Sequence, residues 1–270
     1  MVSLPADPAT PQRAWVRAPS DAYARCLRAD DTITPDVDRA LEQHGGYVAA
    51  LRAAGVEVEI LPPVAGLPDA CFVEDVAVIL DPEFAVLTRP GAVPRQSESA
   101  TIEPRLAEIF AMGQIQAPAT LDGGDVLRLG ARLLVGSSRR TNEAGIEQLR
   151  GLAAPRGLDV LGIPVTAGLH LKSACTALDL TTVLVDPTAL DPGPLRDLGL
   201  RVHAVPEPVG ANVLTLGDRV LVSAAAPKTA RWLESRGRAV VRISLGEFHR
   251  GDGALSCLSL RQAAPGSWVV

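Results

Sequence analysis

Residues 126–135, Val-Leu-Arg-Leu-Gly-Ala-Arg-Leu-Leu-Val, read as two short strands, 126–129 and 132–135, joined by a turn about Gly130. Glycine tolerates the backbone conformations of tight turns, so this stretch predicts a hairpin. A helix, a short strand and such a hairpin recur along the chain with a period of roughly 40–50 residues, which is typical of repeat architectures. This repeated unit decides the fold.

Five units can be recognised. The first four predict hairpins at 72–80 with 84–88, 126–129 with 132–135, 174–178 with 182–185, and 213–216 with 220–222. The fifth ends in one strand, 254–260, with no partner after it, and residues 14–17 can supply one. Pairing of the two ends would close the repeats into a ring without exposed edges. The repetition therefore favours a closed radial α/β arrangement, with helices outside, over an open mixed sheet with the same alternation.

The first helix illustrates the pattern. Thr34 is expected as its N-cap, Pro35 as its first residue and Gly55 as its end, and Gly45-Gly46 is a weak point inside it. Residues 1–12, rich in Pro and Ala, predict a flexible tail, and 13–270 a single catalytic domain.

Composition limits the possible functions. The chain has 270 residues, 47% of them hydrophobic, and a formal charge of −5, which argues against nucleic-acid binding. Its four cysteines show no paired spacing, which favours reduced thiols. The first residues do not resemble a signal peptide and no apolar run is long enough for a membrane span, so we expect a cytoplasmic protein with no membrane partner.

Equivalent positions of the repeats carry different polar side chains. Glu74, Asp122, Asn212 and Cys257 lie near the start of the first hairpin strand in their units, and His170 lies just before it in the third. Since equivalent positions of a radial fold converge on its axis, these residues predict a site there.

Three of these side chains suit nucleophilic catalysis. Most cysteines act as small buried hydrophobic residues, and we interpret Cys26, Cys71 and Cys175 in this way. Cys257 differs because it follows a glycine turn at the end of a strand that faces the predicted site, so we interpret it as a nucleophile. His170 enters its strand from a loop and is the candidate general acid and base. Asp122, in Asp122-Gly-Gly-Asp125, can hold that imidazole or simply form a turn. No clustered His and Asp set suggests a metal, so none is expected.

Acidic and basic residues predict the ligand. Glu74 and Asp75 interrupt an apolar run and Asp69 lies nearby, and buried carboxylates need a cationic partner such as a guanidinium. Arg95 and Arg140 follow two of the hairpins. Together they indicate a zwitterionic small molecule with a cationic tail and a carboxylate head.

Several short motifs, in order, resemble the dimethylarginine dimethylaminohydrolase family of the guanidine-modifying (pentein) superfamily. They are Phe-Val-Glu-Asp-Val at 72–76, Thr-Arg-Pro-Gly-Ala at 88–92, Leu-Asp-Gly-Gly-Asp-Val-Leu at 121–127, Ser-Arg-Arg-Thr-Asn at 138–142, Gly-Leu-His-Leu-Lys-Ser at 168–173, Ala-Asn at 211–212 and Asp-Gly-Ala-Leu-Ser-Cys at 252–257. The resemblance implies a five-bladed α/β propeller. It also implies hydrolysis of Nω-methylated arginines to citrulline and a methylamine, without a cofactor, by a monomer or homodimer.

The resemblance also implies residue roles. Cys257 matches the nucleophile, His170 the proton donor and acceptor, and Asp122 its orienting acid. The substrate contacts are Glu74 and Asp75 at the guanidinium, Asp69 at the α-amino group, Arg95 and Arg140 at the α-carboxylate, Leu27 in a covering lid, and Gly251 through its main chain.

Three other interpretations stay open. An arginine deiminase shares the Cys, His and acidic residues but typically carries an extra helical insertion. A non-catalytic arginine-binding protein would not need Cys257 and His170. A zinc protein would need ligands beyond one cysteine and one histidine.

Overall fold

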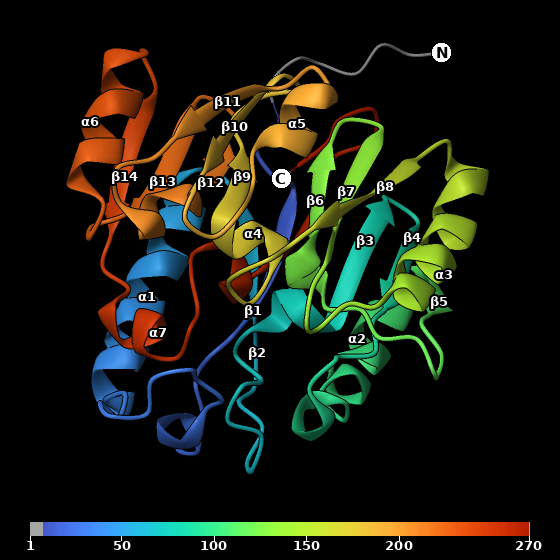
Figure 1. The fold of residues 1–270 in the computed structure, drawn as a ribbon. Coiled ribbons are helices and arrows are strands. Elements are labelled where there is room, and N and C mark those ends of the chain that lie inside the picture. Colours follow the sequence, from blue (N-terminus) through green and yellow to red (C-terminus); the bar gives the residue numbers. More distant parts are fainter. Residues whose placement is uncertain (1–7, 270) are drawn as a thin grey trace.

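Five three-stranded sheets surround a central axis in the computed structural model, which describes residues 8–269 (Figure 1). In each sheet the middle strand pairs antiparallel with the inner strand and parallel with the outer strand. From inner to outer, the sheets are β15 (Leu260–Gln262), β1 (Arg13–Arg17) and β2 (Glu57–Leu61); β3 (Ala77–Asp81), β4 (Phe84–Leu87) and β5 (Ala111–Gln114); β6 (Val126–Leu129), β7 (Arg132–Ser137) and β8 (Asp159–Pro164); β9 (Cys175–Ala177), β10 (Thr182–Val185) and β11 (Arg201–Ala204); and β12 (Leu214–Leu216), β13 (Arg219–Ser223) and β14 (Ala239–Ile243).

The two ends of the chain close the ring. Strand β15 pairs antiparallel with β1, placing Gln262 opposite Arg13 and Leu260 opposite Trp15. The predicted pairing of the last strand with residues 14–17 is therefore confirmed. The open mixed sheet is wrong, because the strands form five separate sheets rather than one.

A helix connects the middle and outer strands of each sheet, as parallel strands require a crossover. These helices are α1 (Val37–Ala53), α2 (Glu103–Ala107), α3 (Glu143–Ala153), α5 (Gly193–Asp197) and α6 (Pro227–Ser235), and they lie at the periphery in Figure 1. Two further short helices, α4 (Leu171–Ala174) and α7 (Gly246–Arg250), lie outside this scheme. The predicted start of α1 is wrong: the side chain of Asp36, not Thr34, accepts the Arg39 N–H, and the helix continues through Gly45-Gly46.

The hydrophobic core consists of five clusters, each between neighbouring sheets. Between the first two sheets, for example, Trp15 packs with Leu87 and Ile102, all of them buried. Fully burying a side chain of this kind is worth about 1.5–3 kcal/mol. The clusters hold the blades together and fix where each inner strand begins.

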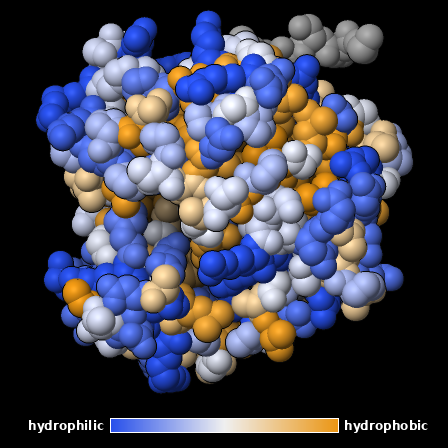
Figure 2. Space-filling view, viewed as in Figure 1, coloured by the Kyte–Doolittle hydropathy of each residue, from blue (hydrophilic) through white to orange (hydrophobic). Residues whose placement is uncertain are grey.

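The surface gives little further indication of function. On the face shown in Figure 2, apolar residues gather towards the upper right, and mostly polar residues cover the rest. Among residues 8–269, no helix is both long and apolar enough to cross a membrane. Of the predicted tail, residues 1–7 lie outside the described residues, and in the remainder Ala9 donates its N–H to the carbonyl of Trp268 (2.8 Å).

Candidate active site

Each inner strand begins after a short helical turn, and these five turns carry the candidate residues. The turns are Val73–Val76, Gly123–Asp125, Leu171–Ala174 (α4), Pro208–Ala211 and Ser256–Leu258. The strands predicted at 72–80 and 254–260 are thus partly wrong, since Glu74, Asp75 and Cys257 lie in 3₁₀ turns. Asp122 and His170 immediately precede their turns, and Asn212 follows its own.

Hydrogen bonds join the five turns into a closed ring. Asp75 accepts the Gly124 N–H (3.0 Å) and Asp125 accepts the Leu171 N–H (2.8 Å). Asn212 then connects α4 with the cysteine turn: its amide donates to the Lys172 carbonyl (2.8 Å) and its Oδ1 accepts the Ser256 N–H (3.1 Å). The Ser256 hydroxyl closes the ring by donating to Glu74 (2.8 Å). Because buried polar groups need such partners, the ring fixes the positions of the turns relative to one another.

The two glycines of the Asp122–Asp125 motif are required by close packing. A Cβ on Gly123 would lie 1.9 Å from the Glu74 carbonyl oxygen. A Cβ on Gly124 would lie 2.6 Å from His170 Nδ1 and 2.7 Å from Asp75 Oδ1. Only glycine lets this turn pass against both neighbours.

His170 is held as an imidazolium. Its Nε2 lies 2.9 Å from Asp122 Oδ2, and its Nδ1 lies 3.9 Å from Asp75 Oδ1. Burial opposes the charge, but Asp75, Asp122 and Asp125 together outweigh it and raise the pKa of His170 to about 9. Asp122 is itself fully buried, and its other oxygen accepts the Gly91 N–H (2.8 Å). At neutral pH the imidazole of His170 is therefore protonated.

Cys257 is a neutral thiol in this environment. Burial, together with the charges of Glu74 and Asp75, raises the pKa of Cys257 to about 12. A hydrogen bond from the Ala254 backbone and the charge of Lys172 oppose that rise only in part. A cation arriving near the thiol would favour the thiolate.

Cys257 and His170 line one small cavity together with most of the predicted substrate contacts. The other members are Leu27, Asp69, Phe72, Asp75, Arg95, Arg140, Leu169, Gly251, Asp252 and Gly253. The cavity volume is only about 10 Å³, room for at most one water molecule. The structure therefore describes a closed form of the site.

The two arginines of the cavity differ in their partners. Buried Nη1 of Arg140 has no hydrogen-bond partner among residues 8–269 and lies 3.5 Å from Asp122 Oδ2. Arg95, by contrast, donates to Asp75 (2.6 Å), to Glu98 and to two backbone carbonyls. Arg140 is thus available to a carboxylate, whereas Arg95 chiefly holds Asp75 in place. With His170, it lowers the pKa of that buried carboxyl despite the opposing effect of burial.

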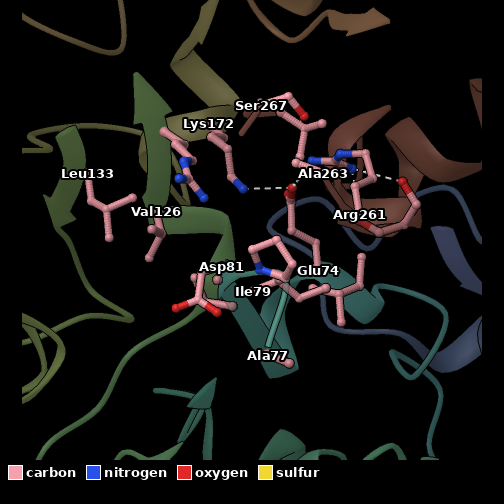
Figure 3. Close-up of a pocket in the computed structure, with 17 residues that line it drawn as sticks. Glu74, Ala77, Ile79, Asp81, Val126, Leu133, Lys172, Arg261, Ala263 and Ser267 are labelled. Carbon is pink, nitrogen blue, oxygen red and sulfur yellow. Dashed lines mark hydrogen bonds and ion pairs between the residues drawn. The ribbon is translucent and has the colours of Figure 1, made fainter. Parts of the chain in front are cut away.

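Glu74 is separated from Asp75. Figure 3 shows its carboxylate between Lys172 and Arg261, with Nζ and Nη2 at 2.6 and 2.7 Å from Oε1. These three residues line a second cavity, whose lining does not include Cys257. Successive side chains of a 3₁₀ turn point about 120° apart, so two neighbours do not face the same cavity. The predicted contact of Glu74 with a guanidinium stays a prediction.

Asp75, Asp122 and His170 are the group that could hold a metal ion, with one ligand atom each within 4.8 Å of the others. Ligation would require His170 to lose its proton, which the same carboxylates retain up to a pKa of about 9. The donor set therefore suits a proton better than a metal at neutral pH.

Some residues of this site were missed or undervalued by the sequence analysis. Asp125, named above only as the end of the Asp122–Asp125 motif, accepts hydrogen bonds from Ser138, Thr141 and the Leu171 N–H and supports the turn after His170. Lys172 and Ser256 were passed over, although Ser256 adjoins Cys257 and Lys172 lies two residues after His170. Their signal was position: they occupy turns equivalent to those of Glu74 and Asp125.

Comparisons with known proteins agree with this geometry. No family model matches the chain. An N(G),N(G)-dimethylarginine dimethylaminohydrolase from Streptomyces coelicolor is 42% identical over 256 residues, covering 93% of this chain and 96% of that protein. The enzyme of the same name from Pseudomonas aeruginosa is 30% identical over 247 residues, covering 91% and 97%.

Solved structures give the same result. The Pseudomonas aeruginosa enzyme complexed with citrulline superimposes with a TM-score of 0.88 at 29% identity, covering 93% of this chain and 99% of that one. The N-terminal domain of ArgZ, an arginine dihydrolase, shares the fold, with a TM-score of 0.84 at 21% identity and coverage of 94% and 98%. The five-bladed α/β propeller implied by the motifs is therefore confirmed. The chain belongs to the dimethylarginine dimethylaminohydrolase family.

Proposed function

We propose that the chain hydrolyses Nω,Nω-dimethyl-L-arginine, and Nω-methyl-L-arginine, to L-citrulline and dimethylamine or methylamine. One observation carries the proposal: a thiol, an imidazolium and the carboxylate of Asp75 line a single cavity that also contains an unpartnered buried donor on Arg140. The first three suit attack on a guanidinium carbon, and the last suits the α-carboxylate of an amino acid.

Charge complementarity orients the substrate. Asp75 is held ionised by His170 and Arg95, and it can accept hydrogen bonds from the guanidinium. Asp69, buried beside Leu27, is the carboxylate available to the α-ammonium, and Arg140 receives the α-carboxylate. Leu27 and Gly251 complete the wall around the substrate.

The reaction proceeds in two halves. Cys257 loses its proton to solvent as the guanidinium binds, since His170 is already protonated. The thiolate then adds to the guanidinium carbon, and His170 gives its proton to the departing dimethylamine as the C–N bond breaks. Since Nε2 is bonded to Asp122, the proton on Nδ1 is the one available. This leaves a cationic thiouronium on Cys257 and a neutral imidazole. His170 then removes a proton from water, which attacks the same carbon and releases citrulline as the C–S bond breaks. General acid–base help of this kind is worth ~10²–10⁴-fold.

The bound substrate helps to ionise its own nucleophile. The free thiol has a pKa of about 12 because it is buried near Glu74 and Asp75. A guanidinium a few ångströms away neutralises part of that negative field and favours the thiolate. All the residues used lie on one chain, so the proposal requires no partner protein.

A citrulline assay tests the proposal. Wild-type protein should form citrulline from asymmetric dimethylarginine, and Cys257→Ser and His170→Ala should form none while retaining the thermal unfolding curve of the wild type. Citrulline formation by either variant would remove that residue from its role.

The same assay separates the alternatives. Preferential turnover of unmethylated arginine would instead assign an arginine deiminase-like hydrolase. Binding of arginine without turnover of either compound would assign a non-catalytic arginine-binding protein.

A further inference from the structure

Asp252 adopts a backbone conformation that aspartate seldom uses. Its φ is +56°, and no other non-glycine residue among 8–269 has a positive φ. It follows α7, where the Gly253 N–H donates to the Phe248 carbonyl (2.8 Å), so Asp252 occupies the left-handed position that normally ends a helix with glycine. Such a conformation persists in a side-chain-bearing residue only when something else holds it, and it is most often found at functional sites.

The Asp252 carboxylate bonds a distant segment. Its Oδ2 accepts the N–H of Ala29 at 2.6 Å, across 223 residues of sequence. Two residues earlier, the Leu27 N–H lies 3.1 and 3.2 Å from the two oxygens of Asp69. Two carboxylates thus hold the main chain of 27–29, which the family resemblance identifies as a lid.

The loop that carries Asp252 is firmly anchored. A Cβ on Gly251 would lie 2.7 Å from the Tyr23 hydroxyl and 2.9 Å from Cys26 Sγ. A Cβ on Gly253 would lie 2.3 Å from the ring of Phe72. Because both flanking glycines pack this closely, the position of Asp252 is fixed relative to Cys257, further along the same loop and turn.

The closed cavity shows why this contact matters. At about 10 Å³ it cannot hold an amino acid of the size of arginine, so part of its wall must move to admit one. Leu27 is an exposed apolar member of that wall, with 37% of its surface accessible, and it is joined to Ala29. Opening of 27–29 breaks the bond between Ala29 and Asp252.

We propose that Asp252 is a positioning residue for hydrolysis: its carboxylate, through the bond to the Ala29 N–H, latches the segment 27–29 over the bound substrate. The inference rests on the proposed function. Asp69 has a different role, because the α-ammonium of the bound substrate competes with the Leu27 N–H for the carboxylate oxygens of Asp69. The bond to Asp252 remains in the complex and keeps the segment closed.

Amide hydrogen exchange without substrate tests the latch. Asp252→Gly removes the carboxylate and keeps a residue suited to a positive φ, and Asp252→Asn keeps an acceptor oxygen in a residue that also tolerates it. We expect exchange of the Ala29 amide to rise about ten-fold in the glycine variant and to stay near the wild-type rate in the asparagine variant. In a citrulline assay, the glycine variant should show a roughly five-fold higher KM, with kcat not lowered.

Two outcomes would overturn the inference. One is an Ala29 amide in Asp252→Gly that exchanges at the wild-type rate. The other is a turnover rate that falls by about two orders of magnitude while that exchange is unchanged, which would place Asp252 at the chemical step. The exchange experiment involves no turnover, so its result tests the latch even if the protein does not hydrolyse methylated arginines.

Discussion

The Asp122→Asn substitution tests the electrostatic arrangement most directly. Asparagine keeps the size of the buried side chain and an oxygen for the Gly91 N–H, but it removes the negative charge beside His170 Nε2. In the wild type, the pKa of His170 rises from 6.5 to about 9, because nearby carboxylates outweigh burial. That rise corresponds to about 3 kcal/mol in favour of the imidazolium.

Removing one of the three carboxylates should lower the pKa of His170 by roughly 1–2. The pH dependence of kcat/KM reports groups of the free enzyme, so its alkaline limb should lie near pH 9 in the wild type and near pH 7–8 in the variant. We also expect kcat/KM to fall about 10²-fold at pH 8, since less of the general acid is protonated and its orientation is lost.

The same shift has a consequence for stability. A group whose pKa is raised on folding contributes its full stabilisation below the unfolded value of 6.5 and loses it as the pH rises through about 9. The wild type should therefore lose stability between these pH values, and the variant should lose less.

The assays are citrulline formation from pH 6 to 10 and urea unfolding at pH 6 and 9. Asp186→Asn is the matched control, because that buried carboxylate accepts only from Thr188 and is not among the groups that shift His170. An alkaline limb that stays near pH 9 in Asp122→Asn would refute the assignment of Asp122 to His170.

Three further predictions concern other parts of the site. Arg140→Met should raise KM roughly 100-fold with a smaller effect on kcat, because the α-carboxylate loses its buried donor; the exposed neighbour variant Arg139→Met should behave as wild type. Iodoacetamide should alkylate Cys257 of the free enzyme at a rate that still rises above pH 9, since burial raises the pKa of Cys257 to about 12. Mass spectrometry measures the rate at Cys257, and a rate that reaches a plateau near pH 7 would contradict this. Gly123→Ala should lower the free energy of unfolding in urea by about 3 kcal/mol, because its Cβ would lie 1.9 Å from the Glu74 carbonyl oxygen. Gly45→Ala in α1, where the new Cβ has nothing within 4 Å, should raise it by roughly 0.5–1 kcal/mol.

The architecture could be predicted from the sequence because it depends on short-range patterns that repeat. Apolar runs on both sides of a glycine predict hairpins such as β6–β7. Four such hairpins and an unpaired last strand leave few arrangements besides a ring. The pairing of β15 with β1 followed from that count. That Asp122, His170 and Cys257 come together could be predicted for the same reason, as equivalent positions of the repeats converge on the axis. The positions of Leu27 and Gly251 were implied only by the family resemblance.

The orientation of individual side chains could not be predicted in this way. Phe72–Val76 contains apolar residues that suit a strand or a 3₁₀ turn, and only packing against Gly123 decides for the turn. In the 3₁₀ turn, the side chain of Asp75 lines the same cavity as Cys257, and the side chain of Glu74 pairs with Lys172. The hydrogen bond between Asp252 and Ala29 joins residues far apart in the sequence, so no local sequence pattern predicts it.

The free site combines two features that would each slow catalysis. Its cavity is closed, and the carboxylates that would attract a guanidinium also keep the Cys257 thiol neutral. A substrate of the right charge can change both features. Its cationic tail offsets the charge of Asp75 near the thiol, and its α-ammonium replaces the Leu27 N–H as the hydrogen-bond donor to Asp69. A neutral molecule of similar shape would relieve neither. Under the proposed mechanism, selectivity for a guanidinium is thus part of the activation of the nucleophile, because Asp75 recognises the cation and, together with burial and Glu74, raises the pKa of Cys257 in its absence.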